Sequence, residues 1–193
     1  MNAEVTAVGV TAVVLCGGTG RRFGGDKTQA LIDGVPVLDH VVGQLPPSWP
    51  VVCVGPERPT VAPVTWVCEE PPGGGPVAAL AAGLAGVGGP VVVVLGGDMP
   101  YAAPAATALV AALLADPAVD AVVGRDPQGR TQPLLAAYRT EALRRAVPDP
   151  PTGVALMRVV DALVHAGVPT DGRAALDIDT REDLRSARHR VEG

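Results

Sequence analysis

A glycine-rich loop near the amino terminus carries the residues best suited to chemistry. It follows a run of Val, Ala and Leu that ends at Leu15, and it reads Cys16-Gly17-Gly18-Thr19-Gly20-Arg21-Arg22-Phe23-Gly24-Gly25-Asp26-Lys27. Glycine leaves backbone N–H groups unhindered, so that they can approach and surround phosphate oxygens. Arg21, Arg22 and Lys27 add positive charge to the same segment. This combination favours binding of a nucleoside triphosphate.

Lys27 is the single lysine among the fifteen basic residues of the chain, and the others are arginines. Arginine can fill any ordinary surface position, so an ammonium kept only in the glycine loop suggests a site that needs a compact charge with a short reach to phosphate oxygens. Chance, in a chain that prefers arginine, is the alternative explanation.

Two common nucleotide-binding motifs do not fit this loop. A dinucleotide-binding fingerprint requires Gly-x-Gly-x-x-Gly, and Phe23 stands where the third glycine should be. The P-loop pattern requires Lys directly after its second glycine, but Asp26 follows Gly25. Hydride transfer and ordinary NTP hydrolysis are therefore both disfavoured.

Asp98 is the second candidate for chemistry. It follows the apolar run 91–95, which is typical of a strand buried on both faces. A carboxylate at the end of such a strand is poorly placed for core packing and well placed to hold a hard cation. We expect Asp98 to bind Mg²⁺ and to connect it to the phosphates, with a solvated loop aspartate as the alternative.

The elements that must position these residues alternate between strand and helix. Apolar patterning and Pro or Gly stops predict strands over 8–16, 51–54, 64–68, 91–95, 119–123 and 134–138, and helices over 37–45, 77–87, 104–114, from 140, over 154–165 and over 180–190. Such alternation predicts an α/β fold: a single Rossmann-like domain over 1–193, with a mostly parallel sheet covered by helices on both faces. The loops after Cys16, Cys68, Leu95 and Ile178 should converge at one crevice.

The glycine loop resembles the Leu-x-Gly-Gly-x-x-x-Arg-Met/Phe-Gly-x-Asp-Lys pattern of the molybdenum cofactor guanylyltransferases, the MobA-like branch of the nucleotidyltransferases. Every fixed position from Leu15 to Lys27 matches. The resemblance continues through 69–76, through Gly97-Asp98-Met99-Pro100-Tyr101, and through 177–184. It therefore extends over nearly the whole chain.

The resemblance implies a reaction and a set of site residues. GMP would pass from GTP to the phosphate of molybdenum-molybdopterin, with pyrophosphate leaving and Mg²⁺ as cofactor. Arg22, Lys27 and Asp98 would be catalytic, with the metal on Asp98 and the pyrophosphate held by Arg22 and Lys27. The nucleotide would be bound by the residues Leu15, Cys16, Gly17, Gly18, Lys27, Glu70 and Asp98. Cys16 would contribute its backbone rather than its thiol, and Asp26 would fix the loop.

Several positions depart from the family pattern, among them Glu70, which stands where Asp is usual. Asp177 and Asp179 stand where asparagines are usual, and Gly55-Pro56-Glu57-Arg58 replaces a turn that contains asparagine. The two carboxylates could repel an anionic pterin, and Asp179 could either add a metal ligand or cap the last helix. A relative that uses CTP or a sugar-phosphate acceptor therefore stays open, as does a nucleotide-binding module without turnover. The combination of Arg22, Lys27 and Asp98 disfavours the module.

Composition excludes several other classes. A net charge of −5 and 3% aromatic residues offer no basic stripe or stacking platform for nucleic acid. An uninterrupted apolar span and a basic amino-terminal start are both missing, so we expect a cytoplasmic protein without membrane contact. Its small-molecule partners would be GTP and molybdopterin, with transient contact to molybdoenzyme maturation proteins. Remaining polar residues are interpreted as surface or packing groups: His40, His165 and His189 on predicted helices, Gln132 at a solvated strand end, and Arg139, Arg144 and Arg145 on a solvated helix face. The alternatives are that Gln132 faces the acceptor pocket and that the three arginines form a basic patch for the acceptor.

Overall fold

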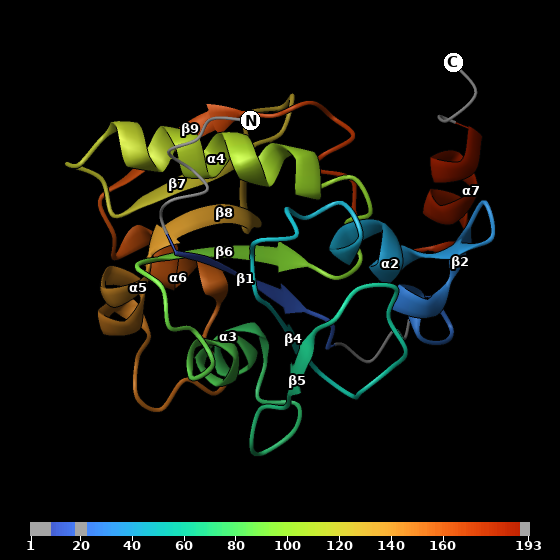
Figure 1. Ribbon diagram of the computed structural model, residues 1–193, viewed down its shortest axis with the longest axis horizontal. Coiled ribbons are helices and arrows are strands. Elements are labelled where there is room, and N and C mark those ends of the chain that lie inside the picture. Colours follow the sequence, from blue (N-terminus) through green and yellow to red (C-terminus); the bar gives the residue numbers. More distant parts are fainter. Residues whose placement is uncertain (1–8, 18–22, 190–193) are drawn as a thin grey trace.

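A seven-stranded sheet forms the centre of the described part of the chain, residues 9–17 and 23–189 of the computed structural model (Figure 1). Its spatial order is β5-β4-β1-β6-β8-β7-β9. The strands are β1 (Val10–Leu15), β4 (Val51–Val54), β5 (Thr65–Val67), β6 (Val91–Gly96), β7 (Ala121–Arg125), β8 (Thr131–Arg139) and β9 (His165–Pro169). All neighbours are parallel except β8, which runs antiparallel between β6 and β7. The predicted mostly parallel α/β sheet is confirmed.

Strand order reverses beside β1, and this reversal locates the site. From β1 the chain goes to β4 and β5 on one side, and then returns to β6 on the other side. Ligands bind at such switch points, beyond the carboxyl ends of the strands. In the paired register Leu15 lies opposite Val54 and Gly96, so the ends of β1, β4 and β6 are level. The glycine loop and Asp98 both leave from this edge.

Helices cover both faces of the sheet (Figure 1). One core contains residues of α2 (Val37–Val42) and α4 (Ala103–Ala115) together with Ala12 and Val14 of β1. The other contains residues of α3 (Pro76–Leu84), α5 (Thr140–Ala146) and α6 (Leu156–Asp161) together with Val13 and Leu15. Successive side chains of a strand point to opposite faces, so an apolar run such as β1 is what a two-sided core requires.

A smaller layer packs beside the site edge of the sheet. The 3₁₀ turn η1 (Lys27–Gln29) leads into the hairpin of β2 (Leu31–Ile32) and β3 (Val35–Pro36). Asp33 and Gly34 form its two-residue turn, both with positive φ, a conformation that Asp-Gly adopts readily. Helix α7 (Arg181–His189) packs Ala187 on Ile32, Val37 and Ile178 in a small third core. This hairpin was not predicted.

One predicted helix is wrong in its second half. The helix expected over 154–165 ends at Asp161, and His165 instead begins the strand β9, which pairs in parallel with β7. Periodicity alone favoured a longer helix, but the edge of β7 offers backbone hydrogen bonds to β9, and tertiary pairing overrides local propensity. His40 lies on α2 and His189 ends α7, as predicted. In the described ranges no helix is long and apolar enough to cross a membrane.

Candidate active site

The backbone of Cys16 and Gly17 is held between the ends of two neighbouring strands. Cys16 N donates to Val54 O at 2.8 Å, and Gly97 N donates to Leu15 O at 2.9 Å. A Cβ on Gly55, whose φ is +141°, would lie 3.2 Å from the carbonyl carbon of Cys16 and 3.3 Å from Gly17 N. The start of the glycine loop is therefore fixed by close backbone packing. The importance of Gly55 was not seen in the sequence, although the unusual turn that it begins was.

The thiol of Cys16 does not contribute to the chemistry of the site. Its side chain is buried, and the interaction with Cys53 together with burial raises the pKa of the thiol far above its usual range. A thiol that stays protonated is a poor nucleophile and a poor ligand. Cys16 can therefore offer the site only its backbone. The next residues of the loop, Gly18 to Arg22, lie outside the described residues, so the roles of Gly18 and Arg22 stay predictions.

Asp26 fixes the other end of the loop, as predicted. Its Oδ1 accepts from Thr28 N at 3.0 Å and from Thr28 Oγ1 at 2.7 Å, which caps η1. Its Oδ2 accepts from Arg58 Nε at 2.6 Å. Partial burial would raise the pKa of Asp26, but the hydrogen bonds from Thr28 and Arg58 outweigh it and hold this pKa below its usual value. Asp26 is thus ionised and fully engaged in structure.

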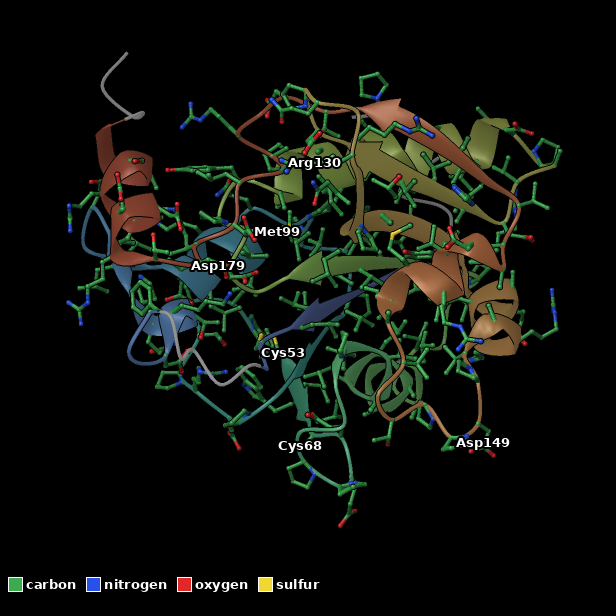
Figure 2. All side chains as sticks on the ribbon, turned by 180° about the vertical axis from the view of Figure 1, so that it is seen from behind. Cys53, Cys68, Met99, Arg130, Asp149 and Asp179 are labelled. Atoms are coloured by element: carbon green, nitrogen blue, oxygen red, sulfur yellow. The ribbon has the colours of Figure 1, made fainter. Side chains whose placement is uncertain are left out.

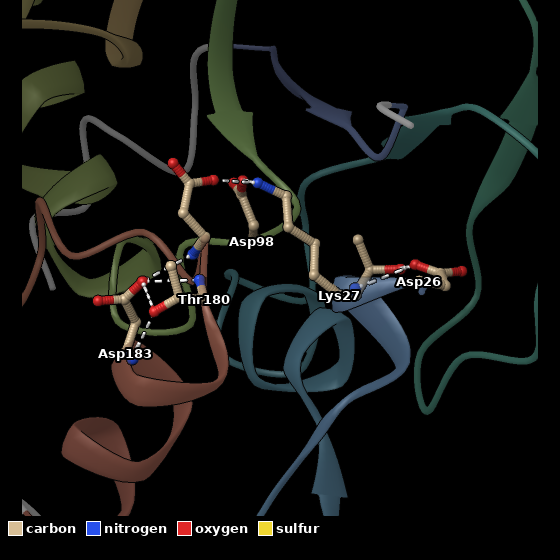
Figure 3. Close-up of polar contacts among 7 residues, drawn as sticks. Asp26, Lys27, Asp98, Thr180 and Asp183 are labelled. Carbon is tan, nitrogen blue, oxygen red and sulfur yellow. Dashed lines mark hydrogen bonds and ion pairs between the residues drawn. The ribbon is translucent and has the colours of Figure 1, made fainter. Parts of the chain in front are cut away.

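Lys27 joins Asp98 to Asp179. Its ammonium forms an ion pair with Asp98 Oδ2 and lies 2.7 Å from Asp179 Oδ1 (Figure 3). Burial acts to lower the pKa of Lys27, but the hydrogen bonds and charges of Asp179 and Asp98 more than compensate, so this pKa is raised. The two predicted catalytic residues, Lys27 and Asp98, are therefore in direct contact, and Asp179 completes a cluster that the sequence spacing does not reveal.

The segment before α7 brings Asp177 and Asp179 to this cluster. Ile178 N donates to Asp98 O at 3.0 Å, and Figure 2 shows Asp179 close to Met99 beyond the end of β6. Partial desolvation of its carboxyl group and the charges of Asp179 and Asp98 raise the pKa of Asp177, although the residue as a whole is exposed. The helix that follows is capped by Thr180 and not by Asp179. Helix capping was one of the two roles predicted for Asp179, and Thr180 has this role instead.

Thr180 and Asp183 form a capping box at the start of α7. Asp183 Oδ2 accepts from Thr180 N at 2.7 Å, and Thr180 Oγ1 accepts from Asp183 N at 3.1 Å (Figure 3). These reciprocal bonds satisfy backbone N–H groups at the start of α7 and define where the helix begins. They also fix the chain direction directly after Asp179.

A cavity of about 280 Å³ lies beside this cluster. Its lining residues come from the ends of β1 and β6, from the loop before α3, from α3 itself and from β8; they are Leu15, Gly17, Glu69, Gly73, Gly75, Pro76, Ala79, Asp98 and Leu134. A smaller hollow next to it is lined by Leu15, Cys16, Gly17, Asp26, Lys27, Thr28 and Asp98. Asp98 therefore borders both spaces. The predicted convergence of the loops after β1, β5 and β6 is confirmed.

Glu69, rather than Glu70, faces this cavity. The carboxylate of Glu69 accepts from Gly73 N at 3.1 Å, which holds it within its own loop. Glu70 is exposed and is not among the residues that line the cavity. Two adjacent glutamates look equivalent in a sequence, and only the course of the loop decides which of them points inward.

Arg139 ends β8 and so is not on the predicted helix face, whereas Arg144 is exposed on α5 as predicted; both also bind the carbonyl ends of helices. Arg139 donates to carbonyl groups at the end of α4, and Arg144 donates to those at the end of α3. These bonds satisfy carbonyls that a helix end leaves without partners. Arg145 is exposed, as predicted. Arg139 pairs with Val91 at the start of β6, so these arginines lie at the end of the strands that faces away from the site.

Gln132 is half-buried, and its amide donates to Asp126 at 3.3 Å. It lies near the start of β8, where it pairs with Gly124 of β7, so its predicted place at a strand end is confirmed, although the side chain is only partly solvated.

Solved structures with the same fold include two nucleotide-related proteins. The molybdopterin-guanine dinucleotide biosynthesis protein A of Archaeoglobus fulgidus has a TM-score of 0.73 and 22% identity, with 94% of this chain and 98% of that chain covered. The 2-C-methyl-D-erythritol 4-phosphate cytidylyltransferase of Thermus thermophilus has a TM-score of 0.69 and 18% identity, with 94% and 98% covered. These likenesses show the fold.

Sequence comparison gives the family. A probable molybdenum cofactor guanylyltransferase of Chloroflexus aggregans is 31% identical over 153 residues, which cover 69% of this chain and 67% of that protein. A protein of the same description from Natronomonas pharaonis is 30% identical over 202 residues, covering 94% and 98%. The profile of the MobA-like NTP transferase domain matches residues 12–166. The chain therefore belongs to the MobA-like NTP transferase family, and it is a nucleotidyltransferase.

Proposed function

We propose that this enzyme transfers GMP from GTP to the phosphate of molybdenum-molybdopterin, giving the guanine dinucleotide cofactor and pyrophosphate. The observation that carries the proposal is the continuity of the cavity with the cluster of Lys27, Asp98 and Asp179, through Asp98, which borders both. A nucleotide with its base in the cavity would have its phosphates at that cluster. The relatives described as probable molybdenum cofactor guanylyltransferases support the choice of GTP and acceptor.

Guanine suits the cavity in shape and in hydrogen bonding. Leu15, Ala79 and Leu134 offer apolar surface to the faces of a planar base. The Watson–Crick edge of guanine presents N1–H and N2–H₂ as donors, and Glu69 places a carboxylate acceptor at the cavity wall. Cytosine presents acceptors at the corresponding N3 and O2, which a carboxylate cannot satisfy. Backbone groups of Gly17 and its neighbours would hold the nucleoside further.

Asp98 and Asp179 fit Mg²⁺. Both carboxylates already meet one cation, the ammonium of Lys27, and carboxylate oxygen is the ligand that Mg²⁺ prefers. In the described ranges no group of three or more His, Cys, Asp or Glu side chains is arranged to hold a metal. Nucleotide phosphates and water would therefore complete the shell, as they commonly do for Mg²⁺. The ion would supply charge neutralisation and polarisation of the α-phosphate.

The chemistry is an in-line displacement. An oxygen of the acceptor phosphate forms a bond to the α-phosphorus of GTP, while the bond from that phosphorus to the pyrophosphate breaks. The attacking oxygen is already ionised, so the protein needs no side-chain nucleophile and little help from a base. Asp98 and Asp179 would hold the metal, and Lys27 and Arg22 would bind the departing pyrophosphate. Catalysis would come from positioning and charge neutralisation.

Calorimetry with Mg²⁺ and GTP, CTP or ATP tests the assignment. We expect the wild-type protein to bind GTP at least tenfold more tightly than CTP or ATP, because a mismatched base edge leaves a buried polar group unpaired at about 1–3 kcal/mol. Glu69→Gln should reduce this preference, whereas Glu70→Gln should keep it, since Glu70 is exposed beside the same loop. Equal affinities for GTP and CTP in the wild type would contradict the guanylyl assignment and leave nucleotidyl transfer intact.

A further inference from the structure

Arg58 reaches from the loop after β4 to the end of the glycine loop. Its Nε donates to Asp26 Oδ2 at 2.6 Å, which joins two segments that leave neighbouring strands. Asp26 precedes Lys27 and caps η1, the turn that Lys27 begins. The guanidinium therefore binds the residue directly before Lys27, whose ammonium contacts Asp98. Arg58 itself is not among the residues that line either space of the site.

The guanidinium of Arg58 is itself held in place. Its side chain is only 12% exposed, and Nη1 donates to Pro56 O at 3.1 Å. Its Cζ lies 5.7 Å from the centre of the Trp66 ring, within the range of a cation–π interaction. Trp66 belongs to β5, so the ring that contacts the guanidinium is itself held by the sheet. An arginine fixed in this way loses little further freedom when it binds the carboxylate.

The two ends of the glycine loop are thus anchored by different means. Backbone packing against Gly55 and Gly97 fixes Cys16 and Gly17. A side-chain relay from Trp66 through Arg58 to Asp26 fixes the other end. Lys27 also contacts Asp98 and Asp179, but a metal ion and phosphates would replace those contacts during a reaction. The relay does not involve the ammonium of Lys27. It would therefore persist when that ammonium exchanges the carboxylates of Asp98 and Asp179 for phosphate oxygens.

We propose that Arg58 is a positioning residue for nucleotidyl transfer, which acts through Asp26 to hold Lys27 where the pyrophosphate group of the nucleotide binds. The proposal rests on the proposed function of the site, because it assumes that Lys27 contacts those phosphates. It assigns a role to the turn of 55–58, where the family pattern has asparagine. The ligand class that responds to Arg58 is the magnesium complex of a di- or triphosphate, whatever the base.

Binding of Mg²⁺-pyrophosphate and of Mg²⁺-GTP to the full chain, measured by calorimetry, tests this proposal. Arg58→Met should weaken both by about tenfold, equivalent to ~1.4 kcal/mol. Arg58→Lys should recover part of the loss, because it keeps the charge and loses the planar fork. Asp26→Asn should weaken binding too, and the double variant should lose less than the sum of the single losses, since both act on one contact.

Arg144→Met is the matched control. Arg144 also donates to two backbone carbonyls, but it does so at the end of α3 opposite the site. The Arg144→Met variant should have a lower melting temperature than the wild type, and its affinity for pyrophosphate should stay within twofold of the wild-type value. An equal loss in Arg144→Met would mean that the effect is general destabilisation, and an unchanged affinity in Arg58→Met would mean that the relay does not position Lys27. Either result would overturn the proposal.

Hydrogen exchange separates this proposal from the proposed function. Backbone amides of η1 and its end donate to Asp26 and Lys27, so Arg58→Met should speed exchange at 28–30 and leave β1 unchanged. Unchanged exchange at 28–30 would overturn the role of Arg58 even if GTP binds normally. A wild-type protein that binds neither pyrophosphate nor GTP would instead overturn the proposed function, and with it the catalytic meaning of the relay.

Discussion

Replacing Lys27 by methionine removes the one positive charge that the described residues place between Asp98 and Asp179. Methionine keeps an unbranched side chain of similar length, so packing changes little. The carboxylates of Asp98, Asp177 and Asp179 would then repel one another without a cation among them. We expect Lys27→Met to fold and to be less stable than the wild type at neutral pH.

The magnitude follows from the exposure of the partners. The side chains of Lys27 and Asp98 are 20% and 17% exposed, so water screens this pair only in part. Breaking a buried pair by removing one partner costs about 3–5 kcal/mol, whereas an exposed pair contributes about 0–1 kcal/mol. Asp179 is 42% exposed and belongs to the second class. We therefore expect a loss of about 2 kcal/mol in the free energy of unfolding at pH 7.

The loss should depend on pH in a defined direction. The folded-state pKa of Lys27 is raised above its ordinary value of 10.5. A raised lysine pKa contributes stability that is fully present below the unfolded value and is lost as the pH rises through the folded value. The difference between the wild type and Lys27→Met should therefore be constant from pH 7 to pH 9 and should shrink only above about pH 10.5.

Urea denaturation followed by circular dichroism at pH 7, 9 and 11 measures this difference. Arg185→Met, on the exposed side of α7, is the control for loss of one positive charge, and it should change the unfolding free energy by less than about 0.5 kcal/mol. A difference below that level for Lys27→Met at pH 7 would refute the reasoning. A difference that persists undiminished at high pH would refute it as well, since the lost contribution could not then come from the ammonium.

Three further predictions concern individual residues. Lys27→Arg should lower nucleotidyl transfer at least tenfold, or about 1.4 kcal/mol, in a pyrophosphate-release assay, because a planar guanidinium differs from a point charge in shape and reach. Asp177→Asn should raise the unfolding free energy at pH 7 by about 0.5 kcal/mol, the scale of exposed charge interactions. The raised folded pKa of Asp177 costs stability above that pKa and nothing below the ordinary value of 3.8, so the gain should vanish in acid denaturation curves near pH 3.8. Gly55→Ala should destabilise the protein by about 1–3 kcal/mol and weaken GTP binding in calorimetry, because its Cβ would press on Cys16 and Gly17 at positive φ.

Patterns within short segments predicted most of the sheet. Runs of valine, as in β6, have a single reasonable interpretation because a strand buried on both faces must be apolar throughout. The Asp33-Gly34 turn carried a hairpin signal that was missed, because β2 and β3 have only two residues each. The strand β9 could not be read from its own residues, since its hydrogen bonds come from β7.

The site was predictable to the level of its motifs. Lys27 and Asp98 follow adjacent strands, so their proximity follows from a parallel sheet. Asp179 lies 152 residues from Lys27, and its contact depends on the path of the chain before α7. The relay through Arg58 likewise joins two loops whose conformations no local pattern defines. Tertiary contacts between loops are therefore the part that sequence reasoning did not reach.

Transfer of the GMP group, followed through a label on its α-phosphate, tests the central claim most directly. The full chain is incubated with Mg²⁺, a molybdopterin acceptor and GTP labelled with ³²P at either the α or the γ position. We predict that the α label moves to the acceptor, that the γ label leaves as pyrophosphate, and that CTP gives at least tenfold less product. Asp98→Asn should fold normally and abolish Mg²⁺-dependent transfer. An α label that stays in GTP and does not enter the acceptor product in the wild type, or full transfer by Asp98→Asn, would contradict the account.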